Sequence, residues 1–97
     1  MSVMVIIKRV FRMDQTEKLV PLLKELRQQS AEQQGYISRT TYSNTSDPGE
    51  LIVVTHWETV DDWISWQNHK KAKELQWRID SIIGEKTIFE VYTPEDY

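Results

Sequence analysis

The sequence predicts a single α+β domain with the ferredoxin-like split βαβ arrangement, in which helices cover one face of an antiparallel sheet. Strand and helix periodicities follow one another in the order strand, helix, strand, strand, helix, strand. Residues 44–49 are almost all turn-forming, which predicts a hairpin between the second and third strands. A chain of 97 residues has room for one hydrophobic core, so we expect the domain to span residues 1–97.

The first strand and the first helix are predicted from the amino-terminal third of the chain. Residues 3–11 are mostly β-branched or apolar, and the strand begins with apolar residues on both faces, as in a strand covered on both sides. Asp14 and Glu17 have the spacing of a capping box, which predicts that a helix begins there. Apolar residues then recur at helical spacing up to Gly35, a left-handed stop. Because Pro21 lacks a backbone donor, we expect a kink there or a distorted turn before it.

The second and third strands are predicted at residues 36–43 and 51–57. Both are rich in β-forming residues, and the third is again apolar on both faces. Strict alternation places Tyr36 and Tyr42 on one face of the sheet and Arg39 on the other. On this pattern the three side chains cannot line a single pocket.

The carboxy-terminal third predicts two helical segments and a last strand. Thr59 is expected to cap the first segment, with Asp62 at its third position near the positive end of the helix dipole. Residues 68–71 are expected to break or bend the helix, after which a second apolar stripe ends at Gly84. Residues 87–92 complete the sheet.

The apolar character of the first and third strands also predicts a homodimer. Helices on one face of the sheet leave the other face open, and a monomer would expose a large apolar patch there. Packing the open faces of two copies together hides this patch, and a two-fold interface is the commonest symmetry for such a contact.

The composition excludes several classes of function. Without cysteine the chain has no disulfide framework, thiolate metal site or thiol nucleophile. The net charge is −3 and the twelve basic residues are scattered, so we expect no nucleic-acid partner. The amino-terminal apolar run is too short for a membrane span or a signal peptide, which leads us to expect a cytoplasmic protein with no membrane partner.

Three sets of residues, on the third strand, on the helical segment capped by Thr59 and at the junction that follows it, are candidates for a site. Trp63 and Trp66 could stack on a substrate, or they could fill a small core. Asn68 and His69 stand at the junction of the two helical segments, where His69 is either solvated or covers the mouth of a pocket. His56 on the third strand is either a buried, hydrogen-bonded residue or an acid or base that lines a pocket.

Several of these residues lie in a familiar pattern. Gly35 and Tyr36 enter the second strand, residues 55–58 read Thr-His-Trp-Glu, and Trp63 and Trp66 follow on the next helix. Together with the strand order, this pattern resembles the antibiotic biosynthesis monooxygenase family of the dimeric α+β barrel superfamily. The resemblance implies a dimer with a pocket between sheet and helices that admits a planar aromatic molecule. It also implies a substrate phenol or enol that loses a proton and whose carbanion passes an electron to dioxygen without a metal or another cofactor.

The resemblance assigns possible roles to three residues. Trp66 matches the position of a tryptophan in such oxygenases, where it would position the substrate. Asp62 matches a position where some members carry asparagine, so it could act as the base or simply cap the helix. The expected function is a cofactor-independent monooxygenase for a small phenolic or quinol-like molecule, with Asp62 or His56 as proton acceptor.

Three other functions remain open. A non-catalytic module could bind or detoxify an aromatic ligand in the same pocket. Haem-degrading relatives would place a ligating histidine where this chain has Gln76 and an asparagine near Ile7, which leaves His69 as an alternative haem ligand. A strand-end His56 and Glu58 with His69 could also form the facial triad of an iron oxygenase, although the resemblance implies no metal.

Overall fold

The computed structural model describes residues 2–97 and confirms the predicted fold class. Met1, which the predicted domain includes, lies outside the described residues. The sheet consists of β1 (Val3–Val10), β2 (Tyr36–Ser43), β3 (Glu50–Trp57) and β4 (Ile88–Tyr92). The strands are antiparallel and lie in the order β2-β3-β1-β4.

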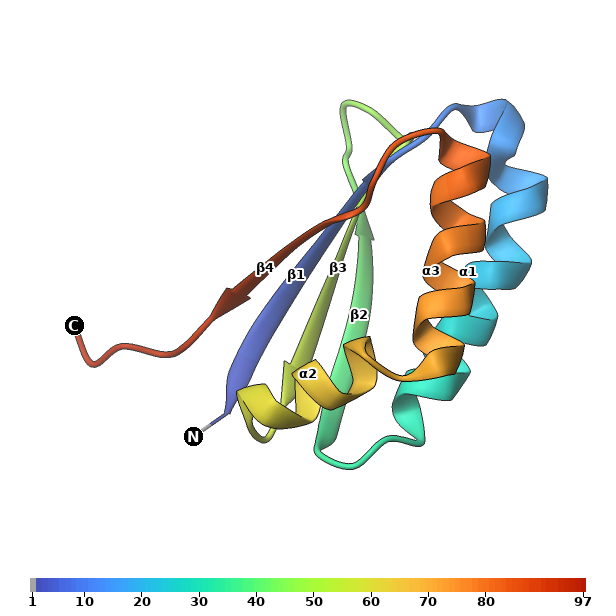
Figure 1. Ribbon diagram of the computed structural model, residues 1–97. Coiled ribbons are helices and arrows are strands. Elements are labelled where there is room, and N and C mark those ends of the chain that lie inside the picture. The colour runs from blue at the N-terminus through green and yellow to red at the C-terminus, as the bar shows by residue number, and fades with distance from the viewer. Residues whose placement is uncertain (1) are drawn as a thin grey trace.

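The helices are α1 (Thr16–Ala31), α2 (Val60–Gln67) and α3 (Lys70–Ile83). In Figure 1, α1 and α3 lie side by side along one face of the sheet, and α2 crosses the end of the sheet where β1 begins. Among residues 2–97 no helix is long and apolar enough to cross a membrane.

The core lies between the helices and one face of the sheet. Val5 of β1 stands opposite Thr55 of β3. Every second residue along each strand from these two points to the same face, which the helices cover. These side chains pack against the apolar stripes of α1 and α3, which have the predicted helical spacing. The buried apolar residues are Val3, Val5, Ile7, Leu19, Leu22, Leu26, Val53, Trp57, Trp63, Trp66, Ala72, Leu75 and Ile79.

The opposite face of the sheet is also apolar. Met4 and Ile6 of β1 and Ile52 and Val54 of β3 point to this side and are half-buried within one chain. Tyr42, Ile88 and Tyr92 on the outer strands are 56%, 56% and 44% exposed. The open apolar face is therefore present as predicted, and the homodimer that would cover it stays a prediction.

The start of α1 differs from the prediction. The backbone N–H of Arg12 donates to Oε1 of Gln15 at 2.9 Å, and Met13–Gln15 form a 3-10 turn before α1 begins at Thr16. The predicted capping box of Asp14 and Glu17 is therefore wrong. The side chain of Gln15 decides where the helix begins, since its Nε2 also donates to the carbonyl of Ile82 at 2.8 Å and connects this turn to α3. The turn is the distorted segment expected ahead of Pro21, and α1 continues through that proline.

The other helix ends follow the predicted pattern. Gly35 and Gly84 both have φ of +83°, although α1 already ends at Ala31. Oγ1 of Thr59 accepts from the backbone N–H of Asp62 at 3.1 Å and caps α2. The break between α2 and α3 falls within the predicted segment, at residues 68 and 69.

A bulge in β2 corrects the predicted faces of that strand. Tyr36 pairs with Trp57 and Ser38 with His56, so one extra residue stands between them. Tyr36 therefore shares the helix-covered face with Arg39, and Tyr42 lies on the open face. The tyrosine ring contacts Trp57 edge to face at a centroid distance of 5.8 Å.

Candidate active site between the sheet and the helices

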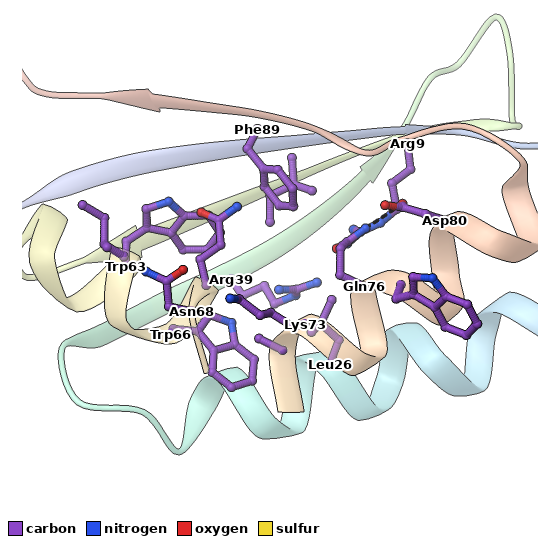
Figure 2. Close-up of a pocket in the computed structure, with 15 residues that line it drawn as sticks. Arg9, Leu26, Arg39, Trp63, Trp66, Asn68, Lys73, Gln76, Asp80 and Phe89 are labelled. Carbon is purple, nitrogen blue, oxygen red and sulfur yellow. Dashed lines mark hydrogen bonds between the residues drawn. The ribbon is translucent and has the colours of Figure 1, made fainter. Parts of the chain in front are cut away.

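A cavity of about 460 Å³ opens between the helix-covered face of the sheet and helices α2 and α3. This volume lies within the range of roughly 300–1,000 Å³ that is common for small-molecule sites. Figure 2 shows Trp63, Trp66 and Asn68 at one end and Arg9, Gln76 and Asp80 at the other. The cavity thus has an aromatic end and a polar end.

The aromatic end is built mainly by α2. Trp63 and Trp66 are three residues apart, so they share one face of the helix, and both are 4% exposed. The Trp63 ring lies 5.7 Å from the Phe89 ring of β4 and 5.8 Å from the Trp57 ring of β3. The two tryptophans on α2 therefore belong to the core and also form part of the cavity wall.

The polar end is a connected set of hydrogen bonds. Nη2 of Arg9 donates to Oε1 of Gln76 at 3.0 Å. Nε2 of Gln76 donates to Oδ1 of Asp80 at 2.8 Å and to Oγ1 of Thr87 at 2.6 Å. Oγ1 and the backbone N–H of Thr87 donate to Asp80 as well, at 2.8 and 3.2 Å. These bonds fix the orientation of the Gln76 amide.

Two arginines give this part of the cavity a positive charge. Arg9 is only 3% exposed, and burial, followed by the charge of Arg39, lowers its pKa to about 10, with Asp80 acting in the opposite direction. Burial also lowers the pKa of Arg39 to about 10, with a smaller opposing effect of Tyr36. Both guanidinium groups stay cationic at neutral pH.

The structure places three of the predicted site residues, Trp63, Trp66 and Asn68, in the cavity wall. His69 lies behind Trp66, with 5.5 Å between the ring centroids. Its Nδ1 accepts from the backbone N–H of Lys71 at 3.0 Å and caps α3. His69 therefore supports Trp66 and the helix junction.

Asp62 and His56 do not line this cavity. Oδ2 of Asp62 accepts from the Thr59 hydroxyl at 2.9 Å, and the carboxylate lies against Gly35. His56 alternates with the core residues of β3 and so points to the open face, where it bonds Oγ of Ser38 at 3.1 Å. The geometry therefore does not support either residue as proton acceptor beside Trp66.

The alternative haem and iron sites also lack their geometry. In the part of the chain that the structure describes, no group of three His, Asp or Glu side chains could hold a metal ion, so His56, Glu58 and His69 do not form a triad. Gln76, at the position of the expected haem ligand, uses its amide to bond Arg9, Asp80 and Thr87.

Sequence reasoning missed most of the polar end. Arg9 stands in period-two register with Val3, Val5 and Ile7, and this register would have placed it on the helix-covered face. Asp80 lies one helical turn beyond Gln76, a spacing that also brings their side chains together. Nothing in the sequence indicates the bulge that turns Arg39 towards this face.

The fold and the cavity define a class, namely ferredoxin-like α+β domains that hold a small-molecule pocket between one face of the sheet and its helices. Within this class, the family model described as antibiotic biosynthesis monooxygenase matches residues 2–77. The chain belongs to this family, as its resemblance predicts.

Solved structures support the fold. A conserved protein from Methanosarcina mazei has a TM-score of 0.89 at 16% identity, over 97% of this chain and 93% of that chain. Rv0793 from Mycobacterium tuberculosis has a TM-score of 0.86 at 18% identity, over 100% and 98%. A mutant of SnoaB, a cofactor-independent oxygenase from Streptomyces nogalater, has a TM-score of 0.85 at 9% identity, over 99% and 95%. The comparison with curated proteins gave no match.

Proposed function

We propose that this protein is a monooxygenase that oxidises a small phenolic or quinol-like aromatic molecule without a bound cofactor. The observation that carries the proposal is the aromatic end of the cavity, with Trp63, Trp66 and Phe89, in a chain of this family. A planar substrate ring would pack against Trp66. The polar end would meet the oxygen substituents of the ring.

In the proposed reaction the phenol loses a proton, and the resulting carbanion passes an electron to dioxygen. The radical and superoxide combine to form a carbon–oxygen bond, and the hydroperoxide takes up a proton. Cleavage of its O–O bond releases water and leaves one oxygen atom of dioxygen on the ring, which becomes a quinone. The protein must exclude bulk water and hold the ring in place for these steps. Asp80 is the one carboxylate among the described residues that line the cavity, and Gln76 and Thr87 already donate to it. We therefore assign Asp80 to holding Gln76, and the proton leaves to solvent on the side of the cavity lined by Trp77, which is 71% exposed.

The proposed working unit is a homodimer formed through the open face of the sheet. Its support is the set of apolar side chains on that face, which no described helix covers. Each subunit would keep its own cavity on the helical side.

The experiment is to incubate the purified protein with a panel of hydroxynaphthalenes, which need one inserted oxygen atom to become quinones, while dioxygen and quinone absorbance are recorded. We expect catalysed dioxygen consumption that persists after treatment with a metal chelator. Trp66→Phe should raise the KM because a smaller ring covers less of the substrate. Tyr97→Phe is the control, since Tyr97 is fully exposed and does not line the cavity. A panel with no turnover above buffer would contradict the proposal.

A second candidate is a non-catalytic module that only binds an aromatic molecule. It is favoured by the placement of Asp62 and His56 outside the cavity, which leaves the wall without a free base. Tight binding of members of the same panel with no dioxygen consumption would select this candidate.

A further inference from the structure

Arg9 has fewer partners than a buried cation normally requires, and Arg39 beside it is half-buried. Nε and Nη1 of Arg9 are buried without a hydrogen-bond partner among residues 2–97. Within the same residues, neither Arg9 nor Arg39 has a carboxylate within the 4.0 Å of an ion pair. Desolvated donors and cations are unfavourable unless something pairs with them.

The surroundings of the two arginines add positive charge. Lys73 lines the same cavity, and Figure 2 places it with Arg39 between the aromatic end and the polar end. A smaller cavity of about 220 Å³ shares the two arginines and is also lined by Lys24 and Arg27. Asp80 is the one acidic residue of the described chain in either lining, although the net charge of the protein is −3.

We infer that Arg9 and Arg39 form a binding site for an oxyanion group carried by the aromatic ligand, so that the substrate class is an aromatic carboxylate or phenolate. The free donors of Arg9 supply hydrogen bonds to the oxygens, and Arg39 and Lys73 supply charge. The aromatic end of the cavity holds the ring.

Guanidinium chemistry supports this class of ligand. A planar guanidinium presents parallel donors that match the oxygens of a carboxylate, and charge-assisted hydrogen bonds are stronger than neutral ones. An anion at this position would satisfy donors that the protein itself leaves free. The inference rests on the proposed function, because it assumes that the substrate occupies this cavity.

The test compares ligands of one shape that differ in charge. Isothermal titration calorimetry of the whole protein would measure the affinities for naphthoate and for naphthamide, its neutral counterpart. A nitrophenol, measured below and above its own pKa, separates phenolate from carboxylate recognition. We expect at least one anion to bind about tenfold or more tightly than its neutral partner. A preference for naphthoate would identify a carboxylate as the group that binds the arginines, and a preference for the nitrophenolate would identify a phenolate.

Charge-neutral variants assign the preference to these residues. Arg39→Gln and Arg9→Gln should each remove most of the preference for the anion and leave the affinity for the neutral ligand within about twofold. Arg12→Gln is the matched control, since Arg12 is exposed and pairs with Asp14. If Arg9→Gln does not fold, Arg39→Gln alone decides, because Arg39 is less buried than Arg9.

Equal affinities for every anion and its neutral partner would overturn the inference, as would equal losses for both ligands in the arginine variants. The assay involves no turnover and so separates the two proposals. Arginine-dependent anion binding without dioxygen consumption would leave the inference standing and contradict the monooxygenase. Turnover of neutral phenols that is unchanged in Arg39→Gln would support the monooxygenase and contradict the inference about the arginines.

Discussion

The carboxylate of Asp62 lies so close to Gly35 that a β-carbon on this glycine would overlap it. The contact joins the end of the α1–β2 connection to the first turn of α2. It gives Asp62 a structural role beside its hydrogen bond from Thr59.

This contact predicts unequal costs for two glycine substitutions. Gly35 and Gly84 share a φ of +83°, but a β-carbon on Gly84 would meet no atom within 4 Å. Gly84→Ala should therefore cost about 1–2 kcal/mol of unfolding free energy, the penalty for the left-handed backbone alone. Gly35→Ala should cost about 1–3 kcal/mol more, because the overlap adds to that penalty. Urea denaturation measures both, and equal costs would show that the contact with Asp62 is easily relieved.

Asp62→Asn tests whether this residue takes the substrate proton. Asparagine keeps an oxygen that can accept from the Thr59 hydroxyl, so we expect turnover to stay within about threefold of the unsubstituted protein. A general base normally contributes about 10²–10⁴-fold to the rate. A loss of that size at unchanged thermal stability would restore Asp62 as the base.

The dimer prediction is tested on the open face of the sheet. Val54→Asp places a charge in the middle of that face, so the variant should sediment as a monomer at micromolar concentration while the unsubstituted chain sediments as a dimer. Val60→Asp is the control, because Val60 is 41% exposed and lies on α2, not on a strand of the sheet. A stable monomer of the unsubstituted chain would contradict the predicted interface.

The affinity for an aromatic carboxylate should be independent of pH between about 6 and 9. The pKa values of Arg9 and Arg39, lowered by burial to about 10, lie above this window, so both cations are present throughout it. Binding of the anion would raise these pKa values further, because an opposite charge favours the cation. Calorimetry across this range measures the profile. A change in affinity within this range would contradict the assignment to the two arginines, because neither of them changes its charge there.

Arg39→Met should increase the stability of the ligand-free protein. Arg39 is half-buried without an ion pair among the described residues, so methionine removes a partly desolvated charge and keeps much of the volume. We expect a gain of about 1 kcal/mol in unfolding free energy. Arg12→Met at the exposed surface should change it by less than about 0.5 kcal/mol. A large loss in Arg39→Met would mean that the guanidinium makes a stabilising contact in the free protein.

Local chemistry in the sequence was sufficient for most of the fold. The Thr59 cap, the left-handed Gly84 and the break after Gln67 each depend on neighbours within four residues, and the structure confirms them. The start of α1 was mispredicted because a contact between segments decides it, namely the bond from Gln15 to Ile82. Sequence spacing does not reveal such a contact.

Only the aromatic end of the candidate site could be predicted from the sequence, because the polar end depends on contacts between distant segments. Trp63 and Trp66 are neighbours on one helix, so their shared wall follows from spacing. Arg9, Arg39 and Gln76 come from β1, β2 and α3, and their meeting depends on the sheet order and on the bulge in β2. The sequence left two interpretations of His56 open, because both faces of β3 are apolar and the pattern alone does not say which face the helices cover.

The most direct test of the proposed function is mass spectrometry of the product formed under ¹⁸O₂. If the protein is a monooxygenase of aromatic substrates, the quinone formed from a hydroxynaphthalene will carry one labelled oxygen atom, and Trp66→Phe will form this product more slowly than the exposed control Tyr97→Phe. A product that contains only unlabelled oxygen would contradict the proposed reaction. Equal rates of formation of the labelled product in Trp66→Phe and in the control variant would contradict its assignment to this cavity.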